Sequence, residues 1–178
     1  MNLMRPETNY LIGSDIVPCN LKKQEVEDYA ENVADECGFF VGADPLILVD
    51  ELGGRTHFED ISSVMSDGGT GSIFVHSSDD FDICLPTYTS PLRDRFTAAH
   101  ELGHYFLHSE QGDIPIIAFR NGSTRIEWEA NWFAAALLMP RAAFMAACEQ
   151  TSSIAVLASQ FGVSQDAARV RQKAIGSD

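Results

Sequence analysis

The sequence predicts one main domain that mixes α-helices with a few short β-strands. Its 178 residues are 45% apolar and 21% charged, which is ordinary for a chain that buries a single core. Short strand-like runs occupy residues 55–86, and segments with helical periodicity lie on both sides. We expect residues 1–20 to be an extension with partial disorder, residues 21–150 the main domain, and residues 151–178 a helical tail.

The first predicted elements are two helices. Residues 21–37 place apolar side chains at steps of three and four with acidic side chains between them, and Gly38 is a plausible stop. Asp44 predicts the N-cap of a shorter helix with Pro45 at its first position, and Gly53 follows its end.

Strands are predicted next. Residues 55–61 can form one, and "SIFVHSSDDFDICLP" at residues 72–86 contains two strand-like runs around a polar turn. The glycine-rich residues 66–72 do not match the phosphate-loop pattern and predict a hairpin loop. Residues 114–120 predict a short strand or a buried loop, followed by a turn at residues 121–123.

Longer helices fill the second half of the chain. Ser90 predicts an N-cap, with Pro91 at the first position of a helix that extends to about His108. A second long helix is expected from about Thr124 to Met139, and Pro140 separates it from a third.

The stretch "RFTAAHELGHYFLHS" contains three of the chain's five histidines, spaced four residues apart. On a helix His100 and His104 lie about 40° apart and one turn from each other, so both imidazoles can bind one ion. Glu101, about 60° around the helix from His104, can reach a water on that ion as a general base. Zinc suits imidazole ligands and hydrolysis, so we predict a Zn²⁺ site.

Two other residues of this helix, Gly103 and His108, bear on how the helix packs and on which side chains bind the metal. Gly103 costs about 1 kcal/mol relative to alanine in mid-helix, which favours the close approach of another backbone there. Three ligands along a straight helix would spread over about 12 Å, too far for bonds of about 2.1 Å to one ion. We therefore expect His108 to support the site or lie at the helix end rather than bind the metal.

The third ligand is expected from the helix that contains "RIEWEANWFAAALLMP". Glu127 shares its face with alanines and with Asn131, which could hydrogen-bond a ligating histidine. Glu129 shares its face with bulky apolar residues that belong in a core. We favour Glu127 as the third metal ligand, and Glu129 stays open as the alternative.

The segments "RFTAAHELGHYFLH" and "EWEANWFAAALLMP" together resemble the ImmA/IrrE family of zinc metallopeptidases. The upstream "LGG", the two strands before the metal helix and the tail "LASQFGVSQDAARVRQKAIG" are also similar. The resemblance covers about Leu21 to Gly176. It implies an α+β, zincin-like core in which a small, mostly antiparallel sheet packs on helices.

The resemblance also implies a function. Members of the family cleave partner transcriptional repressors of the helix-turn-helix type and so relieve repression of mobile-element or stress genes. Carried over by position, His100, His104 and a glutamate of "EWEAN" would bind zinc, and Glu101 would be the catalytic base. The chain is short for a large additional sensor domain.

The oxyanion of a peptidase reaction needs a donor besides the metal. Tyr88, Tyr105 and Arg93 are the candidates from the sequence, and nothing in the pattern distinguishes them.

Composition bears on partners and location. The net charge is -14, of which residues 1–90 contribute -13, so phosphate backbones should be repelled. The tail resembles a helix-turn-helix, but residues 151–178 have a net charge of only +1. Direct nucleic-acid binding is therefore disfavoured, although a non-catalytic, metal-binding DNA- or protein-binding regulator is the alternative function.

The remaining features predict a cytoplasmic protein. The four cysteines include no C-x-x-C pair, so a cysteine zinc site is not expected. The N-terminal residues lack the continuous apolar run of a signal peptide or membrane span.

Overall fold

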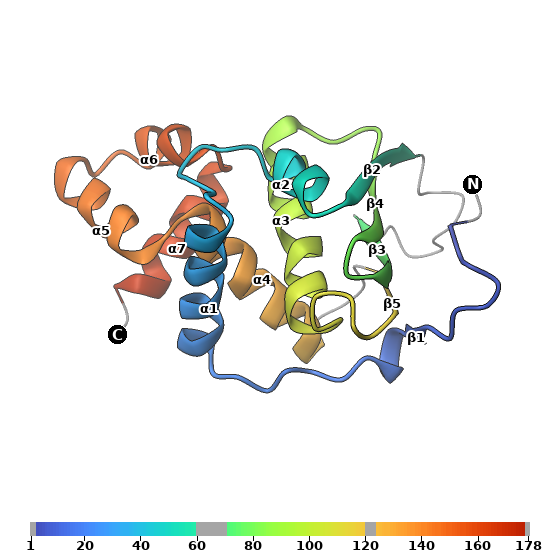
Figure 1. Ribbon diagram of the computed structural model, residues 1–178. Helices are drawn as coiled ribbons and strands as arrows, with labels where there is room; N and C mark the ends of the chain where they lie inside the picture. The colour runs from blue at the N-terminus through green and yellow to red at the C-terminus, as the bar shows by residue number, and fades with distance from the viewer. Residues whose placement is uncertain (1–2, 60–70, 120–123, 177–178) are drawn as a thin grey trace.

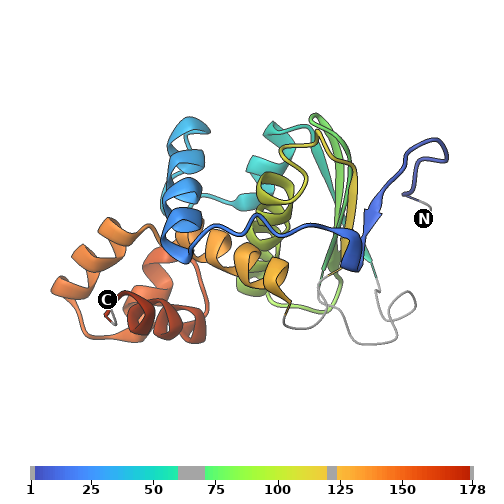
Figure 2. The same ribbon diagram turned by 90° about the horizontal axis from the view of Figure 1, so that it is seen from below.

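The computed structural model describes residues 3–59, 71–119 and 124–176. A five-stranded sheet lies at one end of the molecule, and the helices follow in succession on one side of it (Figures 1 and 2). Helices α2 and α3 lie nearest the sheet, α1 and α4 pack beyond α3, and α5 to α7 form the opposite end (Figure 2). The predicted α+β class is confirmed.

The strands are arranged in the order β1-β5-β3-β4-β2. Their bounds are Leu11–Ile12 for β1, Gly54–Glu59 for β2, Ser72–Ser77 for β3, Asp80–Pro86 for β4 and Ile116–Phe119 for β5. The pairs β3–β4 and β3–β5 are antiparallel, whereas β2–β4 and β1–β5 are parallel.

The sheet is therefore mixed, which corrects the expectation of a mostly antiparallel one. The β3–β4 hairpin is local, and its polar turn shows in the sequence. The parallel pairs join strands that are distant along the chain, so their direction depends on tertiary packing and leaves no local pattern.

The helices agree with the predicted segments. Their bounds are Lys23–Glu36 for α1, Pro45–Glu51 for α2, Pro91–Leu107 for α3, Arg125–Leu138 for α4, Arg141–Gln150 for α5, Ile154–Phe161 for α6 and Gln165–Ile175 for α7. Both predicted N-caps are present: the Asp44 side chain accepts from Leu46 N at 3.1 Å, and the Ser90 side chain accepts from Arg93 N at 3.4 Å. These caps explain where α2 and α3 begin.

Residues 3–20, which show no periodicity in the sequence, run along the molecule before α1 (Figure 2). Strand β1 lies within them and is followed by a short 3-10 turn at Gly13–Asp15. Of the two turns predicted further on, residues 66–70 of the first and residues 121–123 of the second lie outside the described residues.

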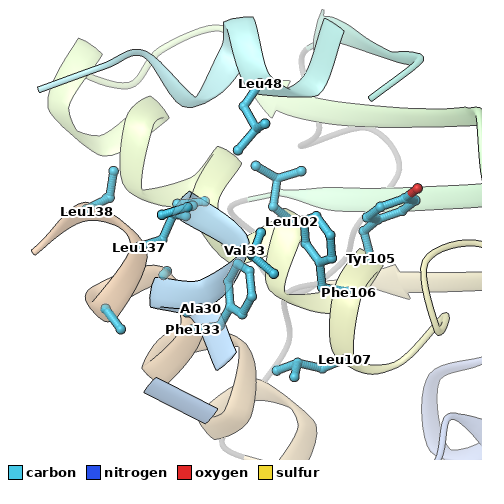
Figure 3. Close-up of a cluster of buried hydrophobic side chains, with 14 of the residues drawn as sticks. Ala30, Val33, Leu48, Leu102, Tyr105, Phe106, Leu107, Phe133, Leu137 and Leu138 are labelled. Atoms are coloured by element: carbon cyan, nitrogen blue, oxygen red, sulfur yellow. The ribbon is translucent and has the colours of Figure 1, made fainter. Parts of the chain in front are cut away.

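A buried apolar cluster joins α1, α3 and α4 (Figure 3). Phe106 of α3 stacks on Phe133 of α4 with ring centroids 5.5 Å apart, and Ala30 and Val33 of α1 lie beside them. Burying a side chain of phenylalanine size contributes roughly 1.5–3 kcal/mol relative to leaving it exposed. This cluster sets the position of α3 relative to α4.

The two helices are in backbone contact at Gly103. A Cβ atom added there would lie 2.9 Å from the Cα and 3.1 Å from the carbonyl oxygen of Ala130. The predicted reason for a mid-helix glycine is thus observed, and this contact brings the polar faces of α3 and α4 together.

The C-terminal helices are tied to the rest of the fold by a buried arginine. Arg171 of α7 is 2% exposed, its Nη1 atom lies 2.8 Å from Glu27 Oε1 of α1, and its Nε–H donates to the Met139 carbonyl at 3.0 Å. Arg95 of α3 also donates to the carbonyl of Gly162, at 2.9 Å, in the turn between α6 and α7.

Within the described residues, no single helix is long and apolar enough to cross a membrane. The bent pair α4 and α5, with an angle of 57° between them, meets the length and composition test only when taken together.

Candidate metal centre

Three side chains that the sequence singles out meet between α3 and α4. His100 Nε2 and His104 Nε2 lie 3.2 Å apart, and the Glu127 carboxylate lies 3.2 Å from the first and 3.3 Å from the second. Both imidazole side chains are fully buried, and Glu127 is 3% exposed. The group has the composition and spacing to hold a metal ion.

The separations agree with those of a tetrahedral site. Ligands bound at about 2.0–2.1 Å in tetrahedral geometry lie roughly 3.3–3.4 Å from one another. The observed separations of 3.2 to 3.3 Å therefore leave room for one ion of that size. Two nitrogen ligands and one carboxylate also suit zinc and leave a fourth position available.

Hydrogen bonds orient both imidazoles toward the common point. His100 Nδ1 lies 3.1 Å from Asn131 Oδ1, which can only accept, so this nitrogen carries the proton. The Nε2 atom of neutral His100 then presents its lone pair to the centre. The role anticipated for Asn131, which lies one turn after Glu127, matches this geometry.

Glu101 is fully buried and lies next to His100 on α3. Its carboxylate points toward the residue that precedes β3, because a Cβ atom added to Gly71 would lie 2.7 Å from Glu101 Oε1. The absence of a side chain at Gly71 thus makes room for the carboxylate. The role of Glu101 as a general base stays a prediction.

The two candidate glutamates have different surroundings. Glu127 faces the imidazoles, whereas Glu129 points away from them and toward His108. Burial raises the pKa of Glu127, but the contacts of its carboxylate with the His100 and His104 imidazoles outweigh this effect and lower the pKa to about 2. A carboxylate that stays ionised among imidazoles favours a positive charge between them.

Glu129 is held by a separate set of donors. Its carboxylate accepts from Arg125 Nε at 2.8 Å, Asn20 N at 2.9 Å, Cys19 N at 3.0 Å and His108 Nε2 at 3.0 Å. Burial raises the pKa of Glu129, and the hydrogen bonds from His108 and Arg125 outweigh burial and lower it to about 2.

His108, at the end of α3, connects the two groups. Its Nδ1 atom lies 3.0 Å from His104 Nδ1, and its Nε2 atom faces Glu129. Burial lowers the pKa of His108, which favours the neutral ring. His108 contacts a candidate ligand and is not among the three side chains grouped around the possible metal position, and its supporting role stays a prediction.

Comparison with known proteins identifies the family of this chain. The family model described as IrrE N-terminal-like domain (Peptidase_M78) matches residues 50–173. The chain belongs to this family. Membership confirms the resemblance to the ImmA/IrrE family that the two helical segments suggest.

Curated proteins gave no match to the chain. Among solved structures, a Mycobacterium tuberculosis transcriptional regulator is similar, with 20% sequence identity and a TM-score of 0.56. The match covers 82% of this chain and 45% of that protein, so the chain spans less than half the length of the regulator. At this identity the likeness supports the shared IrrE-like fold.

Of two hollows in this region, the smaller is lined by a candidate metal ligand and the larger is not. One, of about 460 Å³, is lined by Glu127 itself, the start of α4, the end of β5 and residues of the Gly13–Pro18 segment. The other, of about 830 Å³, lies between α1, α3, α4 and α7 and is lined by Asn131 and by Thr97, one turn before Glu101. Its walls include the half-exposed Trp128.

The three oxyanion candidates lie in different environments. The Tyr105 hydroxyl donates to the Ser78 carbonyl, and its ring stacks on Phe81 at 4.5 Å, so it is engaged on the sheet side. Tyr88 is 87% exposed, and Arg93 lines the larger hollow. Of these residues, Arg93 lies in the hollow that Asn131 also lines.

A second cluster of possible metal ligands lies on the sheet, at His76, Asp80 and Asp82. Two arginines already neutralise its carboxylates. Arg55 contacts Asp82 at 2.8 and 2.9 Å and Asp80 at 2.5 Å, and Arg5 contacts Asp80 at 3.0 Å. Because a divalent ion there would lie beside two guanidinium groups, we interpret the cluster as an ion-pair network that ties the N-terminal segment to β4.

Sequence reasoning missed the contribution of the N-terminal segment to this region. The backbone N–H groups of Cys19 and Asn20 bind Glu129, and Arg125 also donates to the Leu21 carbonyl at 2.5 Å. Backbone donors leave no side-chain pattern. Asparagine at position 20 is a weak sequence signal, because asparagine adopts the left-handed conformation more readily than most residues. In the structure Asn20 has this conformation, with a φ of 58°.

Proposed function

We propose that this chain is a zinc-dependent metalloendopeptidase. The observation that supports this most is the convergence of His100 Nε2, His104 Nε2 and the Glu127 carboxylate at separations of 3.2 to 3.3 Å, with Glu101 beside them on α3. A structural zinc site has four protein ligands and no need of an adjacent base. Three ligands and a neighbouring carboxylate match a hydrolytic site instead.

Each residue then has a distinct role. His100, His104 and Glu127 would hold the metal, which when bound supplies Lewis-acid polarisation of the scissile carbonyl and acidifies a water. Glu101 takes a proton from the attacking water and delivers it to the leaving amine. Asn131 holds the His100 ring in the tautomer that directs Nε2 inward.

We further propose that the substrate is a partner transcriptional repressor of the helix-turn-helix type, and that its cleavage relieves repression of mobile-element or stress genes. Support comes from family membership. The hollow that Glu127 lines offers a binding site for a polypeptide beside the metal, because it borders a candidate ligand.

Glu101→Gln provides the test, because glutamine has nearly the same shape and cannot act as the base. Cells that produce the wild type should contain a cleaved helix-turn-helix repressor, detected as a new N-terminus by mass spectrometry, and cells that produce Glu101→Gln should not. Metal analysis of both purified proteins is the control, and both should bind one zinc. Equal cleavage by a zinc-loaded Glu101→Gln protein would remove Glu101 from the mechanism.

Metal analysis of three alanine variants tests the ligands separately. His100→Ala and Glu127→Ala should lose zinc, whereas Glu129→Ala should retain it with lower affinity, because Glu129 does not face the imidazoles. Retention of wild-type affinity by Glu127→Ala would reject the ligand set.

A regulator that binds DNA or protein without catalysis is the second candidate. The similar solved structure is titled a transcriptional regulator, and α6 and α7 form a helix pair joined by a short turn. However, Arg171 is buried and the exposed Arg169 lies 2.7 Å from Asp166, so α7 offers only a weak basic surface, with Lys173 as its remaining basic side chain, for phosphate contacts. Tight DNA binding by the isolated chain in a low-salt filter assay would favour the regulator.

A further inference from the structure

A continuous line of hydrogen bonds leads from the candidate metal centre to the N-terminal segment. It passes from His104 Nδ1 to His108 Nδ1 at 3.0 Å, and from His108 Nε2 to Glu129 Oε2 at 3.0 Å. It ends at the backbone N–H groups of Cys19 and Asn20, which lie 3.0 and 2.9 Å from the Glu129 oxygens. His108 and Glu129 are both buried.

The direction of each hydrogen bond follows from the last carboxylate. Ionised Glu129 can only accept, and Arg125 and two backbone N–H groups already donate to it. His108 must therefore present a donor at Nε2, so the neutral ring has its lone pair at Nδ1. That lone pair requires a proton on His104 Nδ1, and neutral His104 then has its own lone pair at Nε2.

This is the tautomer that metal binding requires. His104 Nε2 is the atom that faces Glu127, at 3.3 Å, and His100 Nε2, at 3.2 Å. The opposite tautomer would place a proton where the metal belongs. Metal-ligating histidines commonly donate their second N–H to a carboxylate or carbonyl, and here a second histidine stands between ligand and carboxylate.

We propose that His108 and Glu129 are positioning residues for the metal ligand His104, anchored by the backbone of the N-terminal segment. The proposal rests on metal binding at the centre assigned under the proposed function, and it does not depend on the peptidase reaction. It also assigns a role to Cys19 and Asn20, which lie outside the residues 50–173 that the family model matches.

His108→Leu removes the connection and leaves Glu129 with its other three donors, so the fold should persist. The His104 N–H then loses its acceptor, and loss of such an outer contact typically weakens metal binding about 10- to 100-fold. In His108→Gln the amide oxygen can accept from His104 while its NH₂ group donates to Glu129, so affinity should recover to within a few-fold of the wild type.

The experiment measures the zinc dissociation constant of the full chain by competition with a chromophoric chelator, beside thermal unfolding of each metal-free protein. The matched control is His76→Leu, since His76 is a nearly buried histidine that lies 2.9 Å from a carboxylate oxygen of Asp82 on the sheet. This variant should keep wild-type zinc affinity even if it unfolds at a lower temperature.

The outcomes separate this proposal from the proposed function. Weak binding by His108→Leu, recovery in His108→Gln and no change in His76→Leu would support the positioning role. Wild-type affinity in His108→Leu, or equal losses in the leucine and glutamine variants, would overturn it while the metal centre stands. A wild-type protein that binds no zinc would overturn the metal centre and this proposal together.

Discussion

Replacement of Gly103 by alanine should weaken both the fold and the metal centre. The added Cβ would lie 2.9 Å from Ala130 Cα, 3.1 Å from Ala130 O and 3.3 Å from Ala130 Cβ, where ordinary contacts begin at 3.4 Å. The nearest neighbours are backbone atoms of α4, so no side-chain rotation relieves the clash. The two helices must separate by about 0.5 Å, the difference between 2.9 and 3.4 Å.

Two effects of opposite sign decide the stability. Alanine improves helix propensity by about 1 kcal/mol relative to glycine, whereas overpacking a well-packed interface costs about 1–3 kcal/mol. Because the contact is between backbones, the larger overpacking values apply, and we expect a net loss of about 1–2 kcal/mol. For a chain of this size that corresponds to a fall in Tm of about 2–8 °C.

Metal affinity should respond more sharply than stability. His100 and His104 are on α3, and Glu127 is on α4, so a separation of about 0.5 Å moves one ligand away from the other two. Metal–ligand distances tolerate only about 0.2 Å. We expect weaker zinc binding in a chelator competition and a lower Tm for the metal-free protein by calorimetry. A Gly103→Ala protein with a higher Tm and unchanged zinc affinity would refute the close-contact reasoning.

Three further predictions follow from other contacts. Gly71→Ala places a Cβ 2.7 Å from Glu101 Oε1 and should displace the carboxylate of the proposed base. The cleavage rate should fall roughly 10- to 100-fold, while metal analysis should show that zinc is retained. Arg171→Met removes the guanidinium that lies 2.8 Å from the buried Glu27 carboxylate. The free energy of unfolding, measured in urea, should fall by about 3 kcal/mol. A fall below about 1 kcal/mol would contradict the role of this ion pair. The pKa of Glu129 is lowered from 4.5 to about 2 in the folded protein. Ionised Glu129 therefore contributes about 3 kcal/mol to the free energy of unfolding above pH 4.5, and this contribution disappears as the pH falls toward 2. Acid unfolding of the metal-free protein should show this loss, whereas stability that is constant from about pH 6 to pH 3 would contradict it.

Much of the fold was predictable because its signals are local. The caps at Asp44 and Ser90, each followed by a proline, mark the starts of α2 and α3 through contacts within three residues. The β3–β4 hairpin is likewise visible from two apolar runs around a polar turn. The parallel pairing of β1 with β5 was not predictable, because Leu11 and its partner Ile116 lie far apart along the chain. Their pairing is set by how the finished layers pack, and no pattern within either segment specifies it.

In the candidate site, too, some features were predictable from the sequence and others depend on the fold. The spacing of His100 and His104 on one face of a helix follows from 3.6 residues per turn, so the sequence alone predicts that both can reach one ion. Glu127 and Glu129 are two residues apart on α4 and point in different directions, and the sequence favours the first only through the residues that share its face. Their surroundings in the fold differ clearly, because only Glu127 faces the two imidazoles.

The local features can therefore be read from the sequence alone: the helices, the hairpin, the paired histidines and the adjacent glutamate. Two features emerge only in the folded chain, namely the face of α4 that meets α3 across Gly103 and the hold of the Cys19 and Asn20 backbone on Glu129. This division arises because helical periodicity and capping act within a few residues, whereas contacts between distant segments depend on how all the buried surfaces pack together.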